Sequence, residues 1–435
     1  MTVVPTRAQP DSRIRSGAIA PGVRLHLLPT DRFTTTVCRV VLHRDLGPEA
    51  TATSLLAHVL ESATAKHPSR EALAHRLADL YGAGLDVGVE KMGDRQLLVA
   101  SLDWPTRGVP GRGASVPEGL AFLREILTDP VLRGDGLDPA IVETEARNLA
   151  RALAALKDDK ARYALRRCLE LSCEGEAFAL DAEGRIEDLP AATPQALRLL
   201  HARLLARAPV EILLAGDLSW DEAQAAVGRH LLWPGRERRP APLPPVSSVR
   251  AARARPKRVV ERDAVAQGKL AMVFRAPVPP TSPLLPAAQM LCGVLGGSPV
   301  SRLFKVVREV HGLCYDAGAS WGRAKGMMLV PAGVDPKDEP KARRMILALA
   351  REVAGGALDP QAFEAVREAA RSRIAALRDE RGLALGFAQE MVVLGLPPRP
   401  ETHLARLLAV RPADVRRVGS KLGLDGTFFL TGGKA

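Results

Sequence analysis

The chain of 435 residues lacks several features that would place it in other protein classes. It has no run of 18 or more apolar residues, so we expect no transmembrane helix and no membrane partner. The first residues, MTVVPTRAQPDSRIRSG, lack the apolar segment of a secretory signal, which predicts a cytoplasmic protein. Aromatic residues make up only 4% of the chain, but 46% of its residues are hydrophobic, which is enough for a substantial core.

Cysteine is scarce and shows no ligand-like spacing. The five cysteines are odd in number and form no C-x-x-C pair. Closely spaced pairs are typical of zinc sites and of disulfide frameworks. The sequence therefore predicts buried, reduced thiols at Cys38, Cys168, Cys173, Cys292 and Cys314.

The net charge of +12 is unevenly distributed, which argues against a nucleic-acid partner. The stretch 235–262 holds nine Lys or Arg residues and two Glu, so it alone carries +7. It is also rich in proline, and this composition predicts a solvated, extended linker instead of a shaped binding groove. No zinc finger, RNP-type motif or helix-turn-helix signature accompanies it.

Five residues, His58-Val59-Leu60-Glu61-Ser62, nearly match the inverted zinc motif H-x-x-E-H. In that motif two histidines one helical turn apart bind the metal, and the glutamate acts as general base on a zinc-bound water. The fifth position is Ser62 here, and a hydroxyl is a poor ligand for zinc. The match is either a coincidence or a peptidase site that has lost its metal.

The sequence contains an internal repeat. Residues 138–159 align without gaps to residues 359–380 at an offset of 221, with seven identities. Asp138 and Asp359 are good helix N-caps, each followed by a proline. Weaker matches in the same order, such as 81–88 with 311–318, indicate that the chain is two similar halves. We expect domains at 1–220 and 263–435, joined by a Pro/Arg-rich linker region at 221–262.

Each half has the pattern of a mixed α+β domain. The strands expected in the first half are 22–29, 34–43, 86–90, 95–103 and 210–215, and the helices are 49–65, one after Ser69, 117–128 and 138–171. The second half predicts strands at 269–276, 315–320, 327–334 and 427–430, and helices at 284–294, 301–310, 338–354 and 359–379. This order favours an antiparallel sheet with helices packed on one face in each half.

From 22 to 432 the chain resembles the inverted-zinc-motif metallopeptidases, the pitrilysin, insulinase and mitochondrial-processing-peptidase family. The resemblance rests on the duplicated half, on the helix with His58 and Glu61, and on the segment 295–304 with the residues that follow it. The amino-acid sequence at 80–83 and at 158–164 is similar to that of a bacterial non-catalytic subgroup, whose members are encoded with an active relative. The resemblance implies two related halves and a partner chain.

The family pattern also implies that the metal site is incomplete. Its third ligand is a glutamate on the long helix after the second strand pair, seven residues beyond an upstream glutamate. Glu143 and Glu145 lie in that region, but Ala150 and Ala152 stand where the ligand is expected. With two of three ligands missing, we expect no metal and no zinc cofactor unless a partner or an improvised site supplies it. His58 and Glu61 are then a vestigial ligand and a vestigial general base.

The second half keeps an arginine and a tyrosine seven residues apart, Arg308 and Tyr315, which in the family reach toward the substrate. A guanidinium can bind peptide carbonyls and a phenol can donate to an oxyanion. The resemblance also implies that the glycine-rich turn at Gly296 and Gly297 handles peptide. From the residues alone, Arg308 is equally well a surface charge, Tyr315 a core residue and the glycines a tight turn.

We therefore expect a catalytically silent peptidase homologue that forms a heterodimer with an active zinc peptidase of the same family and binds an unfolded peptide. Two alternatives stay open. One is an active metallopeptidase with a non-standard site at His58 and Glu61, and the other is a scaffold subunit that binds no peptide. The sequence leaves the substrate and the partner chain undetermined.

Overall fold

A computed structural model of the protein describes residues 14–109, 112–242 and 245–432. Most of the N-terminal stretch on which the prediction about a secretory signal rests lies outside these ranges. Within them, no helix is both long and apolar enough to cross a membrane. All five cysteines are buried and free, and burial raises the pKa of Cys292 to about 12 and that of Cys314 to about 11.

The first sheet has six strands in the order β1-β2-β10-β3-β5-β4. Most neighbours are antiparallel, but the closing strand β10 inserts between β2 and β3 and runs parallel to β2. The bounds are β1 Arg15–Ala20, β2 Val23–Pro29, β3 Thr35–Asp45, β4 Gly84–Met92, β5 Arg95–Pro105 and β10 Val210–Gly216. Two short hairpins pair β6 Arg107–Val109 with β7 Arg112–Ser115 and β8 Leu132–Arg133 with β9 Gly136–Leu137.

The second sheet follows the same plan in the order β11-β16-β12-β15-β13, with β14 also paired to β15. Its closing strand β16 lies between β11 and β12 and runs parallel to β11, as β10 runs parallel to β2. The bounds are β11 Lys257–Arg262, β12 Gly268–Arg275, β13 Cys314–Ala317, β14 Ser320–Gly322, β15 Met327–Val334 and β16 Gly423–Thr431. The predicted duplicated α+β fold is confirmed, although each sheet is mixed and not wholly antiparallel.

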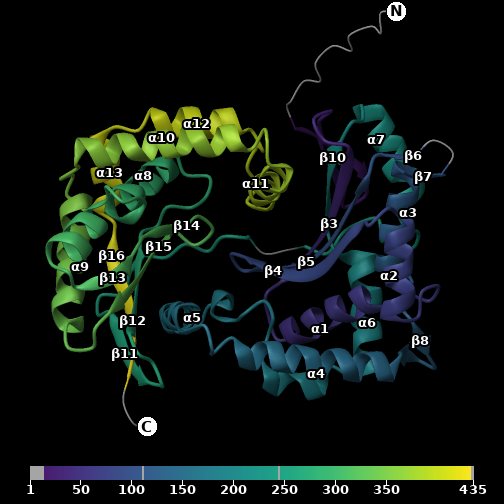
Figure 1. The fold of residues 1–435 in the computed structure, drawn as a ribbon, viewed down its shortest axis with the longest axis horizontal. Helices are drawn as coiled ribbons and strands as arrows, with labels where there is room; N and C mark the ends of the chain where they lie inside the picture. Colours follow the sequence, from purple (N-terminus) through teal and green to yellow (C-terminus); the bar gives the residue numbers. More distant parts are fainter. Residues whose placement is uncertain (1–13, 110–111, 243–244, 433–435) are drawn as a thin grey trace, which may run out of the picture. The chain divides into compact units, whose positions relative to one another are not determined.

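Most helices of the first half lie on one side of the first sheet (Figure 1). They are α1 Ala50–Ser62, α2 Arg70–Asp79, α3 Val116–Thr128, α4 Pro139–Ala155, α6 Pro194–Arg207 and α7 Trp220–Ala226, with short turns at η2 Ile186–Ala191 and η3 Val227–Leu231. The short turn η1 Ala177–Ala179 instead packs on the helix at 160–172. The predicted Ser69 cap is confirmed, since its hydroxyl accepts from the Ala72 amide. The helix expected over 138–171 is instead two helices, α4 and α5 Lys160–Ser172, broken at 156–159.

The second half contributes α8 Leu285–Gly296, η4 Leu303–Val310, α9 Glu339–Ala354, α10 Pro360–Ala376, α11 Arg381–Val393, α12 Pro400–Leu408 and α13 Pro412–Gly419. The bounds of α4 and α10 differ by 221 residues, and so do those of α5 and α11. The repeat therefore extends through both helices. Asp138 and Asp359 each accept a hydrogen bond from the second amide after them, as N-caps do.

The chain forms two compact units that are not contiguous stretches of sequence. One contains Met1–Leu153, Leu180–Pro244 and Arg381–Glu390, and the other contains Ala154–Ala179, Pro245–Glu380 and Met391–Ala435. Each unit thus takes in one helix from the other half: α5 packs on β12 and β16, and most of α11 belongs with the first sheet. In Figure 1 each of these helices lies on the sheet face opposite the other helices of its unit.

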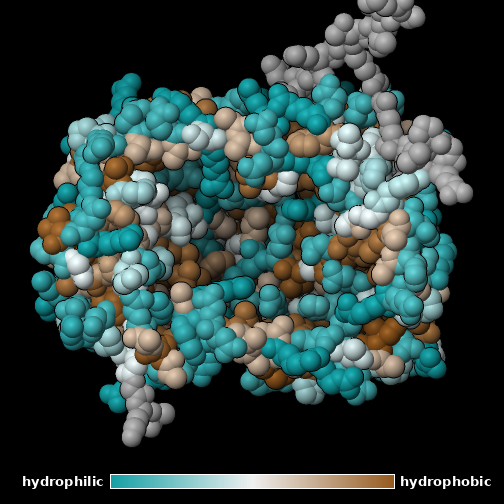
Figure 2. Space-filling view, viewed as in Figure 1, coloured by the Kyte–Doolittle hydropathy of each residue, from teal (hydrophilic) through white to brown (hydrophobic). Residues whose placement is uncertain are grey.

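The prediction of a solvated linker is wrong at both ends of the basic stretch. Near its start, Arg236 donates to the carbonyls of Leu205 and Ala208 and so caps the end of α6. At its end, Lys257–Arg262 forms the edge strand β11. Its side chains alternate, so that Lys257, Val259 and Glu261 are half-buried, whereas Arg258, Val260 and Arg262 are exposed. Val259 packs against the core of the second sheet. Hydrophilic side chains cover most of the face shown in Figure 2.

A buried charge network holds the segment after α5 on the second sheet. The Arg275 guanidinium donates to Glu176 at 2.6 Å and to Asp425 at 3.2 Å, and Lys325 Nζ lies 2.8 Å from the second Glu176 oxygen. These four side chains are at most 4% exposed. Burial alone would raise the pKa of Glu176, but the bonds from Lys325 and Arg275 outweigh it and hold that pKa below its ordinary value.

We expect Glu176→Gln to lower the free energy of unfolding by about 3–5 kcal/mol at neutral pH, because it removes the anion that two buried cations share and leaves only Asp425 in the network. Since the folded pKa of Glu176 is depressed, its contribution is complete well above 4.5 and is lost as pH falls through the folded value. Urea unfolding at pH 7 and at pH 4 measures the free energy of unfolding of both proteins. The difference in this free energy between wild type and variant should be smaller at the lower pH. Glu143→Gln, at a carboxylate 71% exposed, is the matched control and should change little.

Candidate functional site

The degenerate motif lies on α1, which packs against the edge strand β4. His58 and Glu61 are half-buried on this helix, whereas Ser62 is only 2% exposed. Glu61 Oε1 accepts a hydrogen bond of 3.2 Å from the Val87 amide of β4. The helix therefore fixes Glu61 against the strand and turns Ser62 into the core.

The Ser62 hydroxyl is already used within its own helix. Its Oγ donates to the Val59 carbonyl at 2.9 Å, so its proton points back along α1. A buried hydroxyl bonded in this way cannot replace an imidazole as a zinc ligand. That Ser62 stands in the place of a lost ligand stays a prediction.

The environment of Glu61 favours its neutral form. Burial raises the pKa of Glu61, and the nearby Asp86 carboxylate raises it further. The Val87 amide bond and the charges of His58 and Arg70 act in the opposite direction but do not cancel the effect. A carboxyl whose pKa is raised suits a general base, but only when it has a water to activate.

Glu145 lies on the buried face of the long helix α4, at a position where the spacing of the helix's buried residues predicts an apolar side chain. The buried side chains of α4 are Val142, Glu145, Leu149 and Leu153, so the carboxylate sits in the apolar stripe and is 2% exposed. Arg70 of α2 donates to Glu145 Oε1 at 2.8 Å, and Asn148 donates to Oε2 at 3.0 Å. Both carboxylate oxygens are thus engaged.

The residues present do not fit a zinc ion. Among the described residues no group of three or more His, Cys, Asp or Glu side chains is placed to hold a metal. Ser62 is bonded to Val59, and Glu145 is neutralised by Arg70. The nearby His67 is bound to Glu125 at 2.8 Å, and His75 is 78% exposed on α2. We derive no chemical step through a metal at this site.

Sequence reasoning missed Arg70, Asn148 and Asp86. A signal for Glu145 was available, because a charge in the apolar stripe of an amphipathic helix requires a partner. No comparable signal points to Arg70, which lies 75 positions earlier in the chain and meets Glu145 only through tertiary packing.

In the second unit, Arg308 lies in η4 and Tyr315 on the edge strand β13. Both are exposed, and the Tyr315 side chain is 79% exposed, so it does not fill the core. The Arg308 guanidinium carbon lies 4.6 Å from the centre of the Phe304 ring, and its charge reaches Cys314, the residue before Tyr315. The register of β13 against β15 shifts between Cys314 and Asp316, so a bulge is centred on Tyr315.

The two glycines have packing constraints. Gly296 closes α8, and its carbonyl accepts from the Ala319 amide at 3.0 Å. A Cβ on Gly296 would lie 2.5 Å from that amide nitrogen, and one on Gly297 would lie 2.7 Å from the Gly293 Cα. Close backbone approach therefore requires glycine at both positions. Their predicted contact with peptide stays a prediction.

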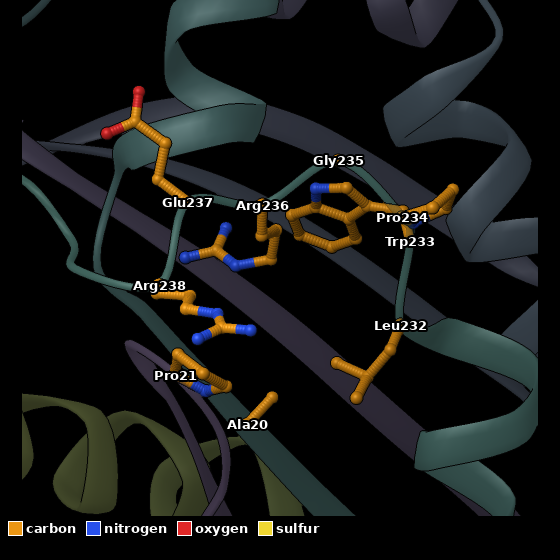
Figure 3. A pocket seen from close by; sticks show the side chains of 9 residues that line it. All are labelled: Ala20, Pro21, Leu232, Trp233, Pro234, Gly235, Arg236, Glu237 and Arg238. Atoms are coloured by element: carbon orange, nitrogen blue, oxygen red, sulfur yellow. The ribbon is translucent and has the colours of Figure 1, made fainter.

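Two surface cavities are lined by residues other than the site residues described above, although the second borders η4, which carries Arg308. One of about 230 Å³ is lined by Ala20, Pro21 and residues 232–238 (Figure 3). In it the Arg236 guanidinium stacks at 5.4 Å from the Trp233 ring and caps α6, so this cavity is explained by packing. The other, about 470 Å³, lies between η4 and α9 and is lined by Arg302, Val306, Lys341, Arg344, Met345, Ala348, Leu349 and Glu352.

The duplicated fold and the altered motif define a zinc-peptidase homologue whose metal site is not built. Residues 191–370 match the family description "Peptidase M16 inactive domain". The chain is 26% identical over 417 residues to "Probable inactive metalloprotease YmfF" of Bacillus subtilis, covering 94% of this chain and 96% of that protein.

Solved structures share the fold of this chain. A conserved protein from Enterococcus faecalis superimposes with a TM-score of 0.86 at 26% identity, over 98% of this chain and 100% of the other. A "peptidase M16 inactive domain" from Pseudomonas fluorescens gives 0.78 at 17% identity, over 97% and 98%, and shows the fold alone. The chain is thus similar to the M16 peptidases, and in particular to an inactive metalloprotease of that kind.

We expect the purified protein to carry far less than one equivalent of zinc, because Ser62 and the Arg70–Glu145 pair leave no adequate ligand set. Elemental analysis after gel filtration without chelators measures the content. Stoichiometric zinc that disappears in His58→Ala would contradict this prediction and would favour an improvised catalytic site.

Proposed function

We propose that this protein is the non-catalytic subunit of a two-chain M16 peptidase, in which it binds peptide and presents Arg308 and Tyr315 to the site of an active partner. The observation that carries the proposal is the contrast between the two units. The motif on α1 lacks a usable ligand set, whereas Arg308 and Tyr315 are both exposed.

The local structure of the second unit supports a role in peptide binding. β13 is an edge strand, so an extended peptide can add to it through main-chain hydrogen bonds. The bulge at Tyr315 orients the phenol outward, and stacking on Phe304 restricts the Arg308 guanidinium. A positioned guanidinium can hold a peptide carbonyl, and a phenol can donate to a developing oxyanion.

A partner of the same family is the simplest source of the missing chemistry. Glu61 remains as a carboxyl of raised pKa without a metal-bound water, so the first unit has no nucleophile to activate. The partner would supply its own zinc ligands and general base. In this arrangement the present chain needs neither zinc nor catalysis of its own.

We expect Tyr315→Phe to lower the kcat of the reconstituted pair by about 100-fold, because it removes one donor to the oxyanion. Arg308→Ala should mainly raise KM, since it removes binding to a substrate carbonyl. Cleavage of a quenched fluorescent peptide by the co-purified pair measures both.

The matched control is Arg351→Ala, which removes another exposed arginine of the second unit, on α9. It should leave both constants unchanged. If Tyr315→Phe and Arg308→Ala also leave cleavage unchanged while the pair stays assembled, the chain acts as a scaffold.

A further inference from the structure

Arg70 of α2 donates to Glu145 of α4 at 2.8 Å, and this ion pair is the link between the vestigial motif and the long helix. Glu145 is 2% exposed, whereas the Arg70 side chain is 61% exposed and reaches inward from α2 to a carboxylate of α4. The charge of Arg70 also acts on Glu61 of α1. The positive charge of Arg70 thus interacts with carboxylates on two different helices, Glu145 of α4 and Glu61 of α1.

A buried carboxylate cannot remain charged in an apolar stripe without a partner. Asn148 satisfies one oxygen of Glu145 but brings no charge, and it is held in place by Arg151, which donates to its Oδ1 at 2.6 Å. The neutralising charge therefore comes from Arg70. The corresponding position of the second repeat, 221 residues later, is the apolar Val366, which packs against Gly293 and needs no cation.

We propose that Arg70 is the resident cation of the first unit's site and takes the charge-neutralising role that a metal ion has in a site of this kind. The site has then been rebuilt around a guanidinium, and restoring the missing histidine alone will not restore metal binding. This inference concerns the chain by itself and does not depend on the partner subunit proposed above.

The test compares cobalt binding by S62H with that of S62H/R70Q. Co²⁺ is a spectroscopic probe for zinc-type sites, and titration is followed by visible absorption and by the melting temperature. We expect S62H to take up no stoichiometric Co²⁺, because Arg70 repels the ion and occupies Glu145. In S62H/R70Q the carboxylate of Glu145, freed of its cation, stands in for the third ligand that the family position lacks. This variant should therefore bind one equivalent, at least about ten-fold more tightly, with a raised melting temperature.

Four further variants separate the effect of charge from other effects. S62H/R70K keeps a positive charge and should behave like S62H. S62H/R76Q removes a different arginine of α2, which pairs with Glu118 at 2.9 Å, and should also behave like S62H. R70Q without added metal should melt roughly 5 °C below wild type, and the double variant R70Q/E145Q should recover part of that loss.

Glutamine at position 70 can still donate a hydrogen bond to Glu145, so circular dichroism should show that the variants stay folded. Equal cobalt affinity of S62H and S62H/R70Q would overturn the proposal. Failure of S62H/R70Q to bind cobalt would also overturn it, because Arg70 and Glu145 would then be an ordinary structural ion pair. Tight binding by S62H/R70K would show that the shape of the guanidinium matters instead of its charge, and would overturn it as well.

Discussion

The second unit depends on a buried charge network between the segment that follows α5 and the sheet beneath it. Arg275, Lys325, Glu176 and Asp425 are all at most 4% exposed, so each charge relies on the others for compensation. Glu176 comes from the first half of the sequence and the other three from the second half. The sheet of one repeat therefore cannot satisfy its buried charges without a segment of the other repeat.

The exchange of helices is reciprocal but the two contacts differ in chemistry. α5 buries Ala164 and Cys168 against Ala271, Val273 and Phe428, and the charge network lies beyond this apolar contact. α11 buries Leu385 and Ala388 and adds polar bonds: Arg381 donates to Asp103 at 2.6 Å, and Gln389 lies between Arg39 and Glu90. Both helices thus combine apolar burial with polar bonds, but α5 is followed by a network of buried charges, whereas the bonds of α11 include neutral amide groups.

Much of the fold could be predicted because local signals agree with the final structure. Asp138 and Asp359 with their following prolines fix the starts of equivalent helices, and alternating apolar residues locate β3, β5 and β15. Gly82 and Gly312 occupy equivalent turns of the repeat, both with positive φ, of 74° and 58°. The exchange of α5 and α11 could not be predicted, because both helices follow their own repeat in sequence and only long-range packing assigns them. β11 could not be predicted, because its many charged residues are typical of a loop. As an edge strand it has only one half-buried face, so few apolar residues are required.

The same distinction applies to the site. The loss of a ligand at Ser62 is visible in five residues, because the spacing of the motif is local to one helix turn. The Arg70–Glu145 pair cannot be seen in these five residues, because its two members lie 75 positions apart in the sequence, on α2 and α4. A site that had merely decayed would be expected to lose its buried carboxylate, as an isolated charge is costly in an apolar stripe. Glu145 is instead paired with Arg70 at 2.8 Å. Under the proposal above, the guanidinium balances this carboxylate as a metal ion would, so α2 and α4 stay joined without one. The proposed role in binding peptide requires only that packing and no metal.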